Sequence, residues 1–127
     1  MIPILVACGV FLGCDMVWLF STGGLYRRML PPILTAHPVV SAAVAFYVVY
    51  LCGLVVFCVR PGLRDGWPLA VGRGAFFGFV AYATYDLTNQ TTVAGWPVGI
   101  TCMDLAWGTF LSGFACLVGW WVARWAR

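Results

Sequence analysis

The sequence contains neither lysine nor glutamate, and it carries little charge of either sign. Charged residues make up 9% of its 127 residues and hydrophobic residues 63%, whereas about 25% of a typical soluble domain is charged. A soluble chain of this length has no core large enough to hide so much apolar surface, because small domains keep much of their surface in water. The composition therefore excludes an ordinary soluble domain and predicts an integral membrane protein.

Basic clusters and metal-ligand motifs are missing as well. The seven arginines lie mostly at the ends of apolar runs, which suits anchoring at lipid headgroups, whereas binding to nucleic acid requires a clustered basic face. There is one histidine, and none of the six cysteines forms a CxxC or Cys/His pair with metal-ligand spacing. We therefore expect no nucleic-acid partner and no metal site, and the sequence indicates no particular cofactor.

Four apolar runs divide the chain. Each is about long enough to cross the ~30 Å of hydrocarbon in a bilayer as a helix, and segments rich in glycine, proline or polar residues separate them. We expect helices at about residues 2–20, 38–59, 69–87 and 98–123, with connecting segments at 21–35, 60–68 and 88–97. The predicted fold is an all-α bundle of four transmembrane helices with short loops, forming a single transmembrane domain over residues 1–127.

Small residues recur at helical spacing in three of these runs. Because residues four positions apart share one helix face, such rows predict close contact between helices. The third run has Gly74, Gly78, Tyr82 and Asp86; the fourth has Asp104, Gly108, Ser112 and Cys116; the second has Ser41, Ala45, Val48 and Cys52.

The arginines also predict an orientation. With four spans, both termini and the connection around residues 60–68 lie on one side of the membrane. That side holds Arg60, Arg64, Arg73, Arg124 and Arg127, whereas the opposite side holds only Arg27 and Arg28. The positive-inside rule therefore favours both termini in the cytoplasm.

Three of the four carboxylates, Asp15, Asp86 and Asp104, lie in apolar runs. A charged side chain in the bilayer costs at least ~2.5–3.5 kcal/mol on insertion scales, so such residues usually face a bundle interior and mark function. In the expected topology all three lie toward the outer side, where an arginine of the first loop would compensate them. We predict an outward-facing polar pocket whose ligand-binding residues are Asp15, Trp18, Tyr26, Arg27, His37, Tyr85, Asp86, Asn89, Asp104 and Trp107.

Several of these stretches also occur together in a known family. They are Asp15-x-x-Trp18, Tyr26-Arg27, Tyr82-x-x-Tyr85-Asp86-Leu87-Thr88-Asn89, Gly95-Trp96-Pro97 and Asp104-Leu105-Ala106-Trp107-Gly108. Over nearly its whole length the chain resembles a family of small bacterial membrane proteins that is catalogued only as a domain of unknown function. The resemblance implies a four-helix protein of the bacterial inner membrane, and it transfers no catalytic residue because no activity is established for the family.

The sequence leaves several functions open. The preferred hypothesis is a membrane protein that binds an amphiphilic small molecule, or another membrane subunit, in the outward pocket. A lipid-modifying enzyme would use the paired carboxylates for acid–base chemistry, and a proton-coupled transporter would use them as a relay. The same carboxylates would also serve as structural ties between helices. Whether the protein is an enzyme, and whether it forms a homo-oligomer, is undecided at this level.

Overall fold

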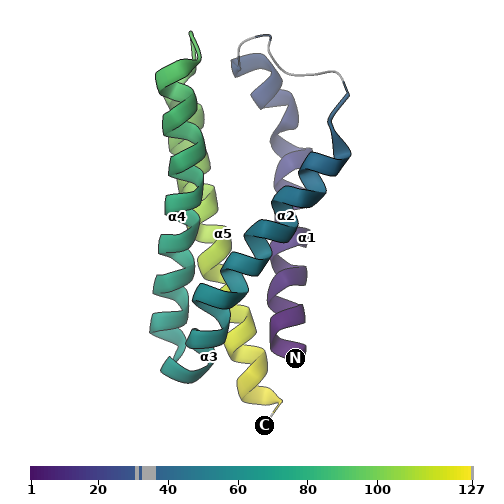
Figure 1. Cartoon of the computed structure of the whole chain (residues 1–127), viewed down its shortest axis with the longest axis vertical. Helices are drawn as coiled ribbons and strands as arrows, with labels where there is room; N and C mark the ends of the chain where they lie inside the picture. The colour runs from purple at the N-terminus through teal and green to yellow at the C-terminus, as the bar shows by residue number, and fades with distance from the viewer. Residues whose placement is uncertain (31, 33–36, 127) are drawn as a thin grey trace.

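The structure, a computed structural model, describes residues 1–30, 32 and 37–126 and is all-α in that part of the chain (Figure 1). Its helices are α1 (Ile2–Met29), α2 (Val40–Leu54), α3 (Arg60–Asp65), α4 (Trp67–Thr92) and α5 (Val98–Trp125), and a π-helical turn, η1 (Val55–Val59), joins α2 to α3. Since α2, η1 and α3 follow one another without a break, they form one continuous rod. The predicted all-α fold with four long helices is therefore confirmed.

Three of the four rods are long and apolar enough to cross a membrane: Ile2–Met29, Val40–Asp65 and Val98–Trp125. The fourth, α4, has 26 residues, but Arg73 and Asp86 interrupt its apolar character. It lies alongside α5 and extends between the same two ends of the bundle (Figure 1). At 1.5 Å per residue each rod is roughly 40 Å long, which exceeds the hydrocarbon thickness and reaches the headgroup regions.

Two helices are longer than the sequence analysis expected. Helix α1 continues through residues 21–29, where we expected a connecting segment, and Gly23 and Gly24 do not interrupt it. Inside a membrane an unpaired backbone group is costly, so a helix tolerates glycine where continuing it keeps every N–H bonded. Helix α4 likewise continues to Thr92. Residues 31 and 33–35 of the expected connection lie outside the described part of the chain.

The bend between α3 and α4 also differs from the expectation of a turn over residues 60–68. Proline has no N–H, so Pro61 cannot donate to the carbonyl one turn earlier. The chain widens into η1 just before it, as helices often do around such a defect, and then continues as α3 to Asp65. The turn itself falls at Gly66, whose φ of 99° lies in the region that favours glycine.

Helix α5 is the centre of the bundle, with α4 packed on one side and α1 on another. The small residues of α4 and α5 face each other, as their spacing predicted. A Cβ atom on Gly74 would lie 2.6 Å from the carbonyl oxygen of Ser112, and one on Gly78 would overlap the carbonyl oxygen of Gly108. These two helices therefore touch backbone to backbone, which only small residues permit.

Helix α2 packs through a different face from the one predicted. Its small residues Ser41, Ala45, Val48 and Cys52 are all exposed. Tyr50 and Leu54 are buried instead, and the ring of Tyr50 stacks on Phe11 with a centroid distance of 4.8 Å. The helix crosses the bundle obliquely (Figure 1), so only its second half meets other helices, and large side chains fill the wider space there.

Candidate functional site: a buried polar network

The network begins at Asp15, which lies near the middle of α1 and is buried. Its Oδ2 atom accepts a hydrogen bond from the Tyr47 hydroxyl of α2 at 2.6 Å. Its Oδ1 atom accepts one from Nε1 of Trp107 of α5 at 3.0 Å. Both carboxylate oxygens are therefore satisfied, and one side chain connects three helices.

A second carboxylate, Asp104, lies one turn before Trp107 on α5 and is also buried. Its Oδ1 atom accepts a hydrogen bond from the Tyr26 hydroxyl, near the end of α1. Between these two contacts the rings of Trp18 and Trp107 stack almost parallel, with their centroids 4.4 Å apart. Helices α1 and α5 are thus joined by two polar contacts and one aromatic stack.

The third carboxylate, Asp86 of α4, has no such partner. Its side chain is 0% exposed and lies against the carboxyl group of Asp104. Neither of its oxygens has a hydrogen-bond partner of normal geometry among the described residues. The polar group beside it is the Asp104 carboxyl, which can pair with Asp86 only when one of the two keeps its proton. Burying a polar group without a hydrogen bond costs roughly 1–3 kcal/mol, and more when the group is charged, so Asp86 is the costliest polar group of the network.

A comparison with known protein families gives one match. The model of the family described as "Predicted membrane protein (DUF2177)" covers residues 1–121. The chain belongs to this family. It is accordingly a multi-pass, membrane-embedded protein in contact with the lipid bilayer. The searches of curated proteins and of solved structures found no match.

The site of this DUF2177 protein unites six of the ten side chains that the sequence singled out: Asp15, Trp18, Tyr26, Asp86, Asp104 and Trp107. Two others lie nearby on α4. Tyr85 is exposed and meets Trp96 edge-on at 6.1 Å, and the half-buried Asn89 contacts the Tyr85 hydroxyl. His37 lies just before α2 and is exposed.

The expected arginine does not compensate the carboxylates. Arg27 is exposed, and the one ion pair among the described residues joins Arg73 to Asp65 at the other end of the bundle. The reason is the unexpected length of α1. Neighbouring residues on a helix point about 100° apart, so the turn that directs Tyr26 at Asp104 directs Arg27 away from it.

The extra turns of α1 also change the depth of the site. We expected Asp15 near the outer end of the first helix, level with the other carboxylates. With α1 continuing to Met29, Asp15 lies close to the middle of the helix and one turn deeper than Asp104, because its partner Trp107 follows Asp104 by one turn. The network therefore has two layers and extends toward the centre of the membrane.

Sequence reasoning missed Tyr47, the donor from α2 to Asp15. A tyrosine in an apolar helix carries one polar group that needs a partner when it is buried. The apolar runs that hold the three carboxylates also contain tyrosine and tryptophan, which are therefore their candidate donors. Tyr82 also lies beside the network: its ring covers Gly108 of α5, and its position on α4 is one turn before Asp86.

Proposed function

We propose that the protein binds an amphiphilic ligand whose polar head donates hydrogen bonds to Asp86. One observation carries the proposal: Asp86 is fully buried, yet neither of its oxygens has a donor in the described part of the chain. Native proteins rarely leave such a group unpaired without a functional reason. In a membrane, an ionisable residue of this kind marks a functional site by default.

The distribution of donors supports this assignment. The Tyr47 hydroxyl and the Trp107 indole are both used by Asp15, and the Tyr26 hydroxyl is used by Asp104. Among the described residues, Asp86 is the one carboxylate of the three that accepts no hydrogen bond from a tyrosine, tryptophan or arginine. A bound molecule with an ammonium, amide or hydroxyl head would supply it.

The surroundings favour an apolar body on that ligand. Residues 40–46 of α2 are all exposed, so this half of the helix leaves the neighbouring face of the bundle open to lipid. We propose that a lipid, an isoprenoid alcohol or a quinol, each with a donor head, approaches from that side and that the helices move apart to admit the head to Asp86, which is fully buried without it. We further propose that the site faces outward from a bacterial inner membrane, because Arg60, Arg64, Arg73 and Arg124 lie toward the opposite end.

The two alternative functions, a lipid-modifying enzyme and a proton-coupled transporter, receive less support. For a lipid-modifying enzyme, both oxygens of Asp15 are already occupied, and His37 is exposed outside the helices. For a proton-coupled transporter, a polar path would have to continue toward the termini. Beyond the buried hydrogen bond of Tyr50 with Ser112, the buried residues of α5 are Ala115, Cys116 and Gly119. Binding of another membrane subunit would appear in native mass spectrometry as a retained polypeptide.

The test is native mass spectrometry of the protein extracted in a mild detergent. We expect the wild type to retain one discrete additional mass and Asp86→Asn to lose it, because the amide lacks the negative charge and one of the two acceptor oxygens that a donor head would bind. Asp65→Asn, the same change in an exposed ion pair, is the control and should retain the mass. If all three proteins retain the same mass, or none retains any, the proposal is wrong; a retained polypeptide would identify a subunit instead.

A second measurement separates binding from a structural role. In ligand-free protein we expect Asp86→Asn to leave the melting temperature unchanged or to raise it, since the new amide can donate to the Asp104 carboxylate and relieves the contact between two carboxyl groups. A loss of more than about 1 kcal/mol of stability, with no retained mass in the wild type, would mean that Asp86 serves only to hold the helices together.

A further inference from the structure

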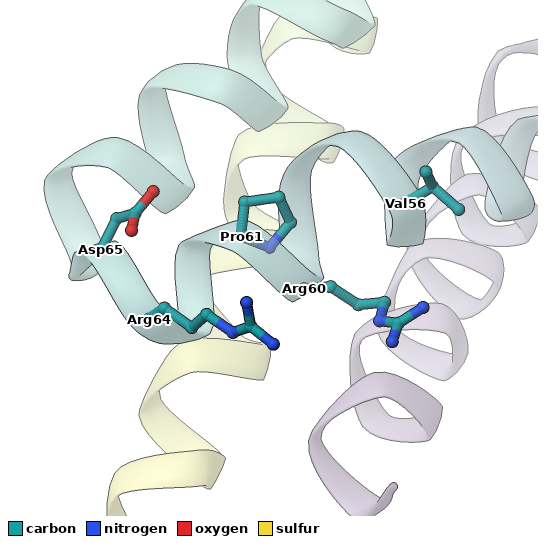
Figure 2. Close-up of a pocket in the computed structure, with 5 residues that line it drawn as sticks. All are labelled: Val56, Arg60, Pro61, Arg64 and Asp65. Atoms are coloured by element: carbon teal, nitrogen blue, oxygen red, sulfur yellow. The ribbon is translucent and has the colours of Figure 1, made fainter.

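Two adjoining hollows lie at the end of the bundle that carries the termini. The first, about 320 Å³, is lined by Val56, Arg60, Pro61, Arg64 and Asp65 (Figure 2). The second, about 250 Å³, is lined by Leu63, Arg64, Gly66, Trp120, Ala123 and Arg124. Because Arg64 belongs to both, they form one arginine-lined region, which we call the arginine hollow.

The charge of this region is not balanced within the described chain. Asp65 is the sole acidic residue at this end, since the other three carboxylates, Asp15, Asp86 and Asp104, belong to the polar network. Asp65 is bound by Arg73, with Nη1 and Oδ2 2.5 Å apart. Arg60, Arg64 and Arg124 therefore have no carboxylate partner among the described residues, and an anion would supply the missing charge.

The geometry concentrates these three charges. Arg60 and Arg64 stand one turn apart on α3, and Figure 2 shows both side chains on the same side of that helix, with the carboxylate of Asp65 turned away from them. Arg124 comes from the last turn of α5 and lies over the ring of Trp120, 5.7 Å from its centroid. Guanidinium groups arranged in this way suit a phosphate, whose oxygens accept paired N–H bonds.

We propose that the arginine hollow binds the phosphate of an anionic phospholipid. The lining favours a lipid over a free phosphate ion, because Val56, Leu63 and Trp120 add apolar surface beside the charges. The hollow also lies where helices that cross the membrane end, which is the level of the headgroups. The second hollow lies between α3 and α5, and basic pockets between transmembrane helices bind anionic headgroups in this manner. The site is separate from Asp86 and does not depend on its ligand.

The experiment is a lipid titration of the full-length protein in detergent, followed by native mass spectrometry. The probes are phosphatidylglycerol, phosphatidylcholine and inorganic phosphate. The test variant is Arg60→Gln with Arg64→Gln. The matched control is Arg27→Gln with Arg28→Gln, which removes the same charge from two exposed arginines at the far end of α1. The melting temperatures of both variants verify that they are folded.

We expect wild-type protein to prefer phosphatidylglycerol to phosphatidylcholine, and the test variant to bind phosphatidylglycerol about tenfold more weakly or worse. The control variant should bind it like the wild type, and millimolar phosphate should not displace it. Equal affinity for the two lipids, or unchanged affinity in the test variant, would overturn the proposal. Displacement by micromolar phosphate would overturn the lipid assignment and make a free phosphate the ligand.

Discussion

Single residues decide how the intramembrane carboxylates are satisfied. The donors that reach Asp15 and Asp104 are the neutral groups of Tyr26, Tyr47 and Trp107. Tyrosine and tryptophan combine an apolar body with one polar group, so they reach a buried carboxylate without bringing a second charge out of water, which is expensive. Neutral donors thus replace the arginine that the sequence led us to expect.

The Tyr47 contact gives a prediction at this scale. Tyr47→Phe removes the hydroxyl that donates to Oδ2 of Asp15 and leaves the ring in place. We expect a loss of about 1 kcal/mol, toward the upper part of the range for hydrogen bonds between membrane helices, measured as unfolding free energy in detergent or bicelles. Tyr85→Phe is the control, because the hydroxyl of this exposed tyrosine contacts Asn89 of its own helix and ties no two helices together. Equal effects of the two changes would show that the Tyr47 hydrogen bond adds nothing as a tie between helices.

At the scale of the helices, the contact of α4 with α5 depends on glycines, which have no side chain to keep the two backbones apart. Gly74, Gly78 and Gly108 bring the two backbones together, and the ring of Tyr82 lies where a Cβ atom of Gly108 would be. Lipid is as apolar as the helix surfaces, so close packing holds membrane helices together where the hydrophobic effect cannot.

Gly78→Ala tests this contact with one methyl group. The added Cβ would overlap the carbonyl oxygen of Gly108, a backbone atom that cannot rotate away. We expect a loss of about 2 kcal/mol or more, within or above the usual range for overpacking, seen as a lower melting temperature. At Gly72, on the same helix, a Cβ meets nothing within 4 Å. Gly72→Ala should therefore leave the stability unchanged or raise it, and similar losses at both positions would contradict the proposed packing.

Across the whole molecule, the polar network and the arginines separate toward opposite ends. Asp86, Asp104 and Tyr26 lie in the half of the bundle away from the termini, whereas Arg60, Arg64 and Arg124 lie at the end with the termini (Figure 1). The first and last helices have their terminal ends at the same end of the bundle (Figure 1), because the chain passes along the bundle four times, an even number.

This separation predicts the topology. The positive-inside rule predicts that the arginine-rich end faces the cytoplasm. We expect green fluorescent protein fused after residue 127 to fluoresce in bacterial cells, and alkaline phosphatase at the same position to be inactive. Alkaline phosphatase inserted between α4 and α5, near Gly95, should be active. The reverse pattern would mean that the network faces the cytoplasm.

The sequence by itself determined the class of protein and the contact between α4 and α5. Its composition requires a membrane, its four apolar runs make four helices, and the spacing of Gly74 and Gly78 against Gly108 and Ser112 predicts which faces of α4 and α5 meet. These properties follow from composition and from the regular geometry of a helix, so they can be read without knowing how helices are arranged.

Only the tertiary structure decided which groups pair. It turned Arg27 outward, brought Tyr47 to Asp15, buried Tyr50 in place of the small residues of α2, and left Asp86 without a donor. Each of these depends on how far a helix continues and at what angle it crosses its neighbours. Those quantities are set by contacts between residues far apart in the chain, such as Tyr26 with Asp104, and local sequence patterns carry no information about them.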